Sequence, residues 1–368
     1  MANKLHILFL CGWYPSRVLT NNGDFIQRHA QAVATKHKVS VLHIITDKNC
    51  KKKIEISIDR KKGVTTYIAY VKQTKNRLIK GYRFYLAFKR LMKLIGEIDL
   101  VHLNEIYPFG IFIFLLNKPY IISEHWTGYH QPQAKNLAKI HLFLSKIITR
   151  NATFICPVSN NLKQALEFLG LKGNYQIVPN VVDTHIFHPI TKSKKTVFTI
   201  LHISNMIDEH KNVSGLISAV SELNFPYQLI LIGENSNQYK SLTKSLGLSK
   251  NVTFINHIPH NEVSKYIQQA DVFTLFSNYE NLPCVILESF ACGIPVISTN
   301  VGGISEFFPE TFGYLIKKNK RHELVEKLTL LYQKPIKNEL EMHNYAKQHF
   351  SYKNIATDFS KLYEKTVS

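Results

Sequence analysis

The sequence predicts an α/β protein made of two Rossmann-like domains that face each other across a cleft. Short apolar runs alternate with helical patterns along the chain, which is typical of βαβ units and parallel sheets. The chain has 368 residues, which suits two domains of ordinary size better than one. Pro, Asn and Lys interrupt the alternation at residues 178–195. We therefore place the first domain at residues 1–185 and begin the second at residue 186.

The first half of the chain is expected to hold eight strands separated by helices. Most of the strands are near-continuous runs of Val, Ile, Leu and Phe, as expected for strands that are covered on both faces. The clearest helical patterns are residues 23–36 and 160–170, and the second ends at a glycine. The expected strands are residues 4–10, 38–45, 53–58, 65–71, 99–105, 119–125, 152–159 and 176–180.

The second half repeats this rhythm. A further apolar helix is expected to begin at Pro283 and to stop at Gly293, because proline favours the first helical position and glycine the position after the last. The expected strands are residues 196–204, 227–234, 251–258, 271–277, 295–299 and 313–317.

Composition excludes several classes of protein. Hydrophobic residues make up 45% of the chain, enough for a folded core. Five scattered cysteines with no Cys-x-x-Cys pair argue against a disulfide framework or a zinc site and fit a reducing compartment. The apolar run at 106–116 is about half the length that a bilayer needs. The apolar N-terminus lacks a small-residue cleavage site and is interpreted as a first strand.

Positive charge is concentrated in the first half. The net charge is +20; residues 1–185 have 27 Lys and Arg against 10 Asp and Glu (+17), and residues 186–368 have 19 against 16 (+3). The segment 71–97 is expected to be a helix in which aromatic residues alternate with basic positions 80, 83, 89, 90 and 93. Such a helix could bind an anionic membrane surface, or it could pack on the sheet with a solvated basic face. We see no nucleic-acid recognition module and expect no nucleic-acid partner.

Several candidate ligand-binding residues follow the predicted strands. Open α/β sheets bind ligands beyond the carboxyl ends of their strands. The candidates at this edge are His125, Ser204, Asn205, Gly233, Glu234 and the segment 277–283.

Glu280 and Glu288 flank the predicted start of the helix at Pro283. A helix N-terminus offers backbone N–H groups and a positive dipole end to an anion such as a diphosphate. A carboxylate can accept hydrogen bonds from two hydroxyls at once, which suits the diols of a sugar or a ribose. This pattern indicates a nucleotide-sugar. The alternative is that Glu280 caps the helix and Glu288 lies on its surface.

The stretch ENLPCVILESFACGIPVISTNVGGISE (280–306) closely resembles the E-x7-E motif and its flanks in the retaining, GT-B-fold glycosyltransferases of family four, the group 1 glycosyl transferases. The resemblance covers most of the chain. It continues in YPSRVLTNNGDFIQRHAQAVA (14–34), SEHWTGY (123–129), VSNNLKQAL (158–166), VPNVVDTHIF (178–187) and HISNMIDEHKN (202–212).

The resemblance implies roles for individual residues. Glu280 would contact the donor sugar, Glu288 the ribose, and Lys211 the leaving diphosphate. Gly23 would let the first domain's backbone approach the donor, and His125 would lie beside the sugar's reactive carbon. The catalytic candidates are thus His125, Glu280 and Lys211. The donor-binding candidates are Gly23, Asn205, Lys211, Gly233, Glu234, Asn281, Leu282, Pro283 and Glu288.

The sequence also departs from the family pattern. An arginine is usual early in the 202–212 loop, but Asn205 or Met206 stands there, and Val181 replaces the glycine of the usual VPNG. Lys211 would then carry the diphosphate charge alone or with another base. The chain contains no Asp-x-Asp motif, so we expect no metal ion and no cofactor besides the donor, with cationic and dipolar stabilisation from Lys211 and helix termini.

The resemblance implies a retaining, hexosyltransferase-type enzyme that uses a UDP- or GDP-sugar. Its acceptor would be a glycan or a lipid-linked molecule, in surface polysaccharide biosynthesis. Its helix at 351–368 would return to the first domain, so the second domain would end at residue 350. We expect a cytoplasmic protein that can bind the inner membrane face peripherally. The alternatives are a nucleotide-sugar epimerase or hydrolase on the same fold, and a non-catalytic basic binding protein.

Overall fold

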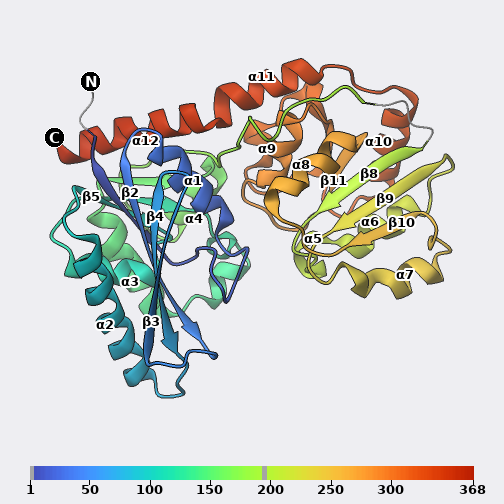
Figure 1. Ribbon diagram of the computed structural model, residues 1–368. Coiled ribbons are helices and arrows are strands. Elements are labelled where there is room, and N and C mark those ends of the chain that lie inside the picture. The colour runs from blue at the N-terminus through green and yellow to red at the C-terminus, as the bar shows by residue number, and fades with distance from the viewer. Residues whose placement is uncertain (1–3, 193–196) are drawn as a thin grey trace. The chain divides into compact units, whose positions relative to one another are not determined.

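The computed structural model describes residues 4–192 and 197–368 and divides the chain into two compact units (Figure 1). The first unit comprises Met1–Val181 and Tyr352–Ser368, and the second comprises Val182–Ser351. From the sequence we placed these divisions at residue 185 and before residue 351. Each unit is an α/β domain around a largely parallel sheet, so the predicted fold class is confirmed.

The first unit has a seven-stranded sheet with the order β3-β4-β2-β1-β5-β6-β7. All neighbouring strands are parallel except β3 and β4, which pair antiparallel. The carboxyl ends of the six parallel strands therefore meet at one edge of the sheet. The strands are β1 His6–Cys11, β2 Lys38–Asp47, β3 Ile54–Lys61, β4 Val64–Lys72, β5 Leu100–Asn104, β6 Tyr120–Glu124 and β7 Phe154–Pro157.

Helices cover this sheet, and the last helix of the chain is among them (Figure 1). The α-helices are α1 Asp24–Ala34, α2 Arg77–Ile95, α3 Lys139–Arg150, α4 Asn160–Phe168 and α12 Tyr352–Val367. Three short 3-10 helices lie in the connections: η1 Phe109–Leu115, η2 Thr127–Tyr129 and η3 Gln133–Asn136.

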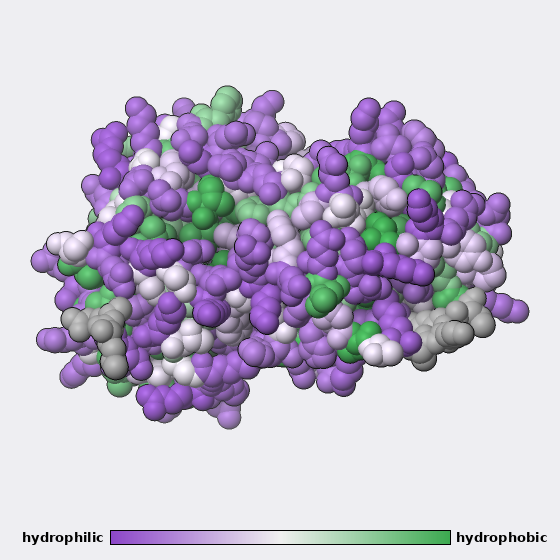
Figure 2. Space-filling view, turned by 90° about the horizontal axis from the view of Figure 1, so that it is seen from above, coloured by the Kyte–Doolittle hydropathy of each residue, from purple (hydrophilic) through white to green (hydrophobic). Residues whose placement is uncertain are grey.

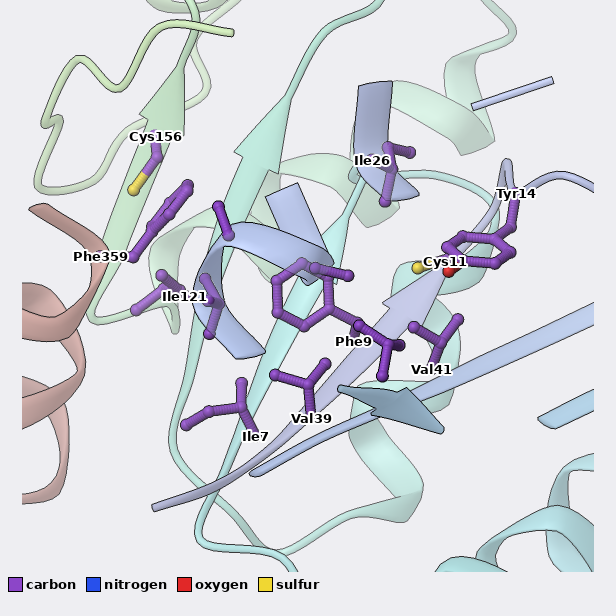
Figure 3. Close-up of a cluster of buried hydrophobic side chains, with 14 of the residues drawn as sticks. Ile7, Phe9, Cys11, Tyr14, Ile26, Val39, Val41, Ile121, Cys156 and Phe359 are labelled. Carbon is purple, nitrogen blue, oxygen red and sulfur yellow. The ribbon is translucent and has the colours of Figure 1, made fainter. Parts of the chain in front are cut away.

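The core of the first unit joins segments from both ends of the sequence. Figure 3 shows Phe9 of β1 among side chains from β2, α1 and β6, with Phe359 of α12 beside Cys156 of β7. Each of these labelled core side chains is at least 98% buried. The strands β1, β5, β6 and β7 are buried throughout, as the continuous apolar runs predicted.

The second unit has a six-stranded parallel sheet with the order β10-β9-β8-β11-β12-β13. Its strands are β8 Phe198–Ile203, β9 Tyr227–Ile232, β10 Val252–Ile255, β11 Val272–Leu275, β12 Val296–Thr299 and β13 Gly313–Ile316. Its α-helices are α5 Asp208–Lys211, α6 Val213–Val220, α7 Lys240–Ser245, α8 His260–Gln269, α9 Cys284–Ala291, α10 Arg321–Gln333 and α11 Glu339–Phe350. Short 3-10 helices are η4 Ser236–Tyr239, η5 Ile304–Phe307 and η6 Glu310–Phe312.

Three sequence-based expectations need correction. Residues 176–180 do not form a strand; Gln176 and Val178 donate to the backbone of β7, but the prolines at 157 and 179 have no N–H to complete a ladder. The helix expected over 71–97 begins at Arg77, because the strand β4 extends to residue 72 and Asn76 caps the helix. Pro283 is the N-cap of α9 and not its first residue. Thr196, the expected start of a strand, lies outside the described residues.

No helix in the two described stretches, 4–192 and 197–368, combines the length and the apolar character needed to cross a bilayer. The apolar run at 106–116 instead forms the short 3-10 helix η1. Figure 2 shows one face of the molecule as mostly hydrophilic, with apolar residues scattered among charged and polar ones.

Candidate active-site residues in the two units

Lys211 and Glu280 form an ion pair in the second unit. The Lys211 Nζ lies 2.5 Å from the Glu280 Oε1, and the two side chains are only 17% and 8% exposed. The loop that leads to Glu280 is tied to α5: the Asn278 N–H donates to the carbonyl of His210, and its amide donates to the carbonyl of Glu209. These bonds hold the end of α5, with Lys211, against the glutamate. The sequence resemblance assigned both residues to the donor but did not predict that they pair.

Gly302 and Gly303 pack against the backbone of the loop that carries Glu280. Gly302 has a φ of +61°, and a Cβ there would lie 2.0 Å from the Glu280 carbonyl oxygen. The neighbouring Gly303 N–H donates to the carbonyl of Asn281. Only glycine allows this approach of two backbones. The loop after β12 therefore fixes the backbone that carries Glu280.

Glu288 lies in α9, where its side chain is 2% exposed. Its Oε1 is 2.7 Å from the Nε2 of His260, the first residue of α8. Glu288 is therefore not the surface residue of the alternative interpretation. The sequence analysis did not identify His260, because the spacing of residues 260 and 288 does not indicate that they are in contact.

The N-terminus of α9 lies between the two glutamates in sequence. Asn281 and Leu282 are buried, and Pro283 precedes the first helical residue with extended backbone angles. Glu280, the α9 N-terminus and Glu288 thus lie within nine successive residues of the second unit. Lys211 is brought to Glu280 from 69 positions away.

Two early positions of the loop after β8, Asn205 and Met206, provide no second cation in addition to Lys211. Asn205 is exposed, and its side-chain oxygen accepts from the backbone N–H two positions later. Met206 is buried, has a φ of +59° and packs against Gly233. A Cβ on Gly233 would lie 2.0 Å from the carbonyl oxygen of Ser204. A buried thioether cannot supply charge. Gly233 is explained by this close packing, while Glu234 is exposed.

Gly23 and His125 belong to the first unit. Gly23 is the N-cap of α1 with a φ of +72°. A Cβ at this position would lie 2.6 Å from the backbone carbon of Trp13 and 2.9 Å from the nitrogen of Tyr14. Glycine is required here for both the left-handed backbone and the close approach. This packing is within the first unit.

His125 follows β6 and is held by the buried Glu124. One carboxylate oxygen of Glu124 accepts the backbone N–H groups of His125 and Trp126 at 2.8 and 2.9 Å, and the other accepts that of Ile106 at 3.0 Å. The sequence analysis did not single out Glu124. Its three hydrogen bonds fix the backbone at the carboxyl ends of β5 and β6, so Glu124 positions the candidate histidine.

The His125 ring is packed among other rings. Its centroid lies 4.7 Å from that of Phe25 and 5.5 Å from that of His29, and both ring nitrogens are shielded from solvent. Burial lowers the pKa of His125 well below its usual value, and the nearby His29 and His102 add to this, while the side chain of Asn180 acts in the opposite direction. His125 is therefore a neutral imidazole at physiological pH.

The candidate residues thus form two groups, Gly23 and His125 in the first unit and the remaining residues in the second. Over the described parts of the chain, no three or more His, Cys, Asp or Glu side chains gather in an arrangement that could hold a metal ion.

Two family models match adjacent parts of the chain. The model for glycosyl transferases group 1 matches residues 183–349, and the model for glycosyltransferase family 4 matches residues 25–186. Together they span both units.

Individual proteins resemble the chain along most of its length. An uncharacterized glycosyltransferase of Methanocaldococcus jannaschii is 26% identical over 73% of this chain and 76% of its own length. The putative teichuronic acid biosynthesis glycosyltransferase TuaC of Bacillus subtilis is 21% identical over 88% of both chains.

Solved structures share the fold. The sucrose-phosphate synthase of Thermosynechococcus elongatus aligns with a TM-score of 0.81 at 19% identity, over 98% of this chain and 99% of its own. HepE of Anabaena, in complex with UDP-glucose, aligns with a TM-score of 0.73 at 16% identity, over 98% of this chain and 100% of its own.

Proposed function

The chain belongs to the group 1 glycosyltransferases of family 4 and has their GT-B fold, and from this premise we propose its reaction. It transfers a hexose from a UDP- or GDP-sugar to a hydroxyl of a glycan or a lipid-linked acceptor, with retention of configuration at the anomeric carbon. It needs no metal ion and no cofactor besides the donor. The observation that carries this proposal is the cluster of Lys211, Glu280, Glu288 and the α9 N-terminus in one unit.

Each part of the cluster suits one part of a nucleotide-sugar. The ammonium of Lys211 and the N-terminus of α9 bind the diphosphate. The carboxylate of Glu288, oriented by His260, binds the ribose diol, and that of Glu280 binds sugar hydroxyls. Lys211 pairs with Glu280 in this structure, so a diphosphate that binds to Lys211 competes with Glu280 for the lysine.

The transfer step follows a front-face route. The bond between the anomeric carbon and the β-phosphate oxygen breaks, and the acceptor oxygen forms its bond on the same face. The acceptor proton passes to the leaving phosphate oxygen. Lys211 stabilises the negative charge that develops on the diphosphate. His125 lies beside the reactive carbon of the sugar, and its neutral imidazole takes no proton.

The relatives support the substrate class. TuaC is named for teichuronic acid biosynthesis, and the HepE structure contains UDP-glucose. Both fit a nucleotide-sugar donor and a role in surface polysaccharide biosynthesis.

The first test identifies the donor. A thermal-shift screen of UDP-, GDP- and ADP-sugars should show a higher melting temperature with one nucleotide class, because a ligand that binds only the folded state stabilises it. Transfer from that donor should then be lost in Glu280→Ala and in His125→Ala, with unfolding transitions close to that of the parent protein. Full turnover by either variant would remove that residue from the mechanism.

Incubation with the donor alone separates the alternative activities. An epimerase or a hydrolase converts the donor stoichiometrically without an acceptor, whereas the proposed transferase does so slowly. A non-catalytic basic protein would bind DNA or liposomes in a salt-dependent manner without binding any donor.

We also propose that the enzyme acts in the cytoplasm at the inner face of the membrane, where it binds through α2. The residues Ala87, Phe88, Leu91 and Ile95 pack on the sheet, but the first half of the helix is largely exposed. Leu78 and Tyr82 are 84% and 62% exposed, and basic residues lie among them. Apolar and basic side chains on one exposed helix suit an anionic lipid surface.

Flotation with vesicles tests this binding. The protein should float with anionic vesicles and not with neutral ones, and replacing Leu78 and Tyr82 by serine should weaken flotation without changing donor binding. Equal flotation with both vesicle types would contradict an anionic docking surface.

A further inference from the structure

A cavity of about 750 Å³ opens at the carboxyl edge of the sheet in the first unit. The residues that line it come from the loop after β1, the end of β2, the turn into β3 and the end of β4, and they include Arg17, Asp47, Lys48, Lys51, Glu55 and Gln73. None of these residues has a role in the mechanism above. The edge is the one at which His125 follows β6.

Arg17 is fixed in the wall of this cavity. Its Nε lies 2.8 Å from the Asp47 Oδ2 and its Nη2 lies 2.6 Å from the Glu55 Oε2. Its guanidinium carbon stacks 3.8 Å over the ring of Tyr70. Three partners from three strands thus hold the guanidinium in one orientation. A donor that is already ordered loses little freedom when a ligand binds.

The two carboxylates of the cavity are occupied by the protein itself. The second oxygen of Asp47 accepts the backbone N–H of Asn49 at 2.7 Å. The second oxygen of Glu55 accepts those of Lys51 and Lys52 at 2.7 and 3.3 Å. These acids serve to order the turn and the arginine, and they have little accepting capacity left for a ligand.

The groups that remain for a ligand are mostly donors. Across residues 4–192 and 197–368, no described group pairs with the Nη1 of Arg17 or with the ammonium groups of Lys48 and Lys51. Gln73 also lines the cavity. The lining holds three cationic and two anionic side chains, and both anions are already paired. A concave site with a fixed guanidinium and two ammonium groups selects an oxyanion.

We propose that this cavity binds an oxyanion of the acceptor, a carboxylate or a phosphate, and so makes the enzyme selective for acidic acceptors. The inference rests on the proposed transferase function and names the chemistry of its acceptor. The acidic group can belong to an acidic sugar of a glycan or to the phosphate of a lipid carrier.

The position of the cavity sets the size of the acceptor. The sheet order places β1 and β5 between β2 and β6, so the ends of β2 and β6 lie about 14 Å apart at a strand spacing of about 4.8 Å. An acceptor whose reacting hydroxyl lies near His125 and whose anion lies in the cavity is longer than one sugar ring. The acidic group is therefore on a different residue or moiety of the acceptor from the reacting hydroxyl.

The test measures the affinity of the full chain for small probes by NMR titration. The probes are methyl glucuronide, inorganic phosphate and the neutral methyl glucoside. The variant Lys48→Gln/Lys51→Gln removes two cavity charges that have no partner in the described parts of the protein, so it should fold normally. The matched control is Lys52→Gln/Lys53→Gln, which removes two neighbouring exposed lysines outside the cavity lining.

We expect the charged probes to bind and the glucoside not to bind. The cavity variant should weaken binding by about tenfold or more, the size expected for lost charge-assisted hydrogen bonds, and the control should change it by less than about twofold. Equal affinity for glucuronide and glucoside, or an equal loss in both variants, would overturn the proposal.

Two further arms identify the source of the anion. Acidic oligosaccharides are compared as ligands with neutral-lipid vesicles that carry a polyprenyl phosphate. The ligand whose binding is weakened by the cavity variant identifies the acceptor class. If neither ligand binds in this way, acceptor binding at the cavity is refuted. Donor binding by the same variants is followed by thermal shift. Because none of the residues assigned to the donor lines the cavity, intact donor binding without anion binding refutes the cavity alone.

Discussion

The ion pair between Lys211 and Glu280 makes an unusual prediction for Glu280→Gln. This change keeps the shape of the side chain and removes the negative charge that pairs with Lys211 at 2.5 Å. A nucleoside diphosphate no longer has to compete with a carboxylate for the lysine. We therefore expect the variant to bind the diphosphate more tightly than the parent protein while it loses sugar transfer. Lys211→Ala should change the same affinity in the opposite direction.

The size of both effects follows from the contact. A hydrogen bond to a charged group contributes about 1.5–3 kcal/mol, and about 1.4 kcal/mol corresponds to a factor of ten in affinity. Lys211→Ala should thus weaken diphosphate binding by about 10- to 100-fold. Both partners are largely buried, so solvent weakens the pair little, and Glu280→Gln should strengthen binding by up to about tenfold.

Isothermal titration calorimetry with the nucleoside diphosphate that emerges from the donor screen measures both variants. Transfer assays on the same preparations show whether sugar chemistry is lost. A drop in affinity for Glu280→Gln similar to that of Lys211→Ala would refute the competition between the diphosphate and the glutamate.

Three further predictions concern stability and nucleotide binding. Gly23→Ala should lower the free energy of unfolding by about 1–3 kcal/mol, because the new Cβ meets the Trp13 backbone at a positive φ. The control Gly81→Ala, whose new Cβ meets no atom within 4 Å, should instead stabilise α2 by about 0.5–1 kcal/mol. Similar urea midpoints for the two variants would contradict this prediction. His260→Ala should weaken nucleotide binding, because the buried glutamate on α9 loses the ring that orients it; unchanged calorimetric affinity would exclude that role. Burial lowers the pKa of both His29 and His43 from the usual 6.5 to about 4, so the unfolded chain takes up protons at a higher pH than the folded protein does. The free energy of unfolding should therefore fall as the pH drops from about 6.5 to 4, by at most about 1.4 kcal/mol per pH unit for each histidine. A melting temperature that stays constant over this range would contradict the prediction.

Buried acids act against the histidines in this titration. Burial raises the pKa of Glu105 and Glu124 above its usual value, so each contributes stability at low pH that is lost as the pH rises. The first unit also contains His102 and His125, whose pKa values are lowered well below the usual value by burial. Glu105 and Glu124 therefore offset part of the stability that the first unit loses when its buried histidines become protonated.

Local patterns predicted most of the fold. Continuous apolar runs identified the strands of both sheets, because a strand buried on both faces has no polar positions. They failed at residues 176–180, where the composition suits a strand but Pro179 cannot donate a hydrogen bond. They also missed the start of α2 at Arg77, since periodicity alone does not show where β4 ends.

Spacing in the sequence could group candidate residues only where they are close together, while distant candidates such as Lys211 were named through the resemblance and without their contacts. The spacing of Glu280 and Glu288 around a helix start is a local pattern, and together with the resemblance of residues 280–306 to the E-x7-E motif it led to the prediction of a nucleotide-sugar. The partners of these glutamates, Lys211 and His260, come from other βα connections. Which connections meet is set by strand order, and no local pattern encodes that order. The same holds for Arg17, whose cavity is assembled from four separate segments.

The return of α12 to the first unit has a consequence for biosynthesis. Ile355, Phe359 and Tyr363 of this helix are completely buried in the first unit's core, yet they follow the whole second unit in the chain. During translation the second unit, residues 182–351, is therefore complete before the first unit has all of its core. The part of the core that α12 supplies stays incomplete until these last residues are synthesised, so the domain that is made first is the last to complete its core.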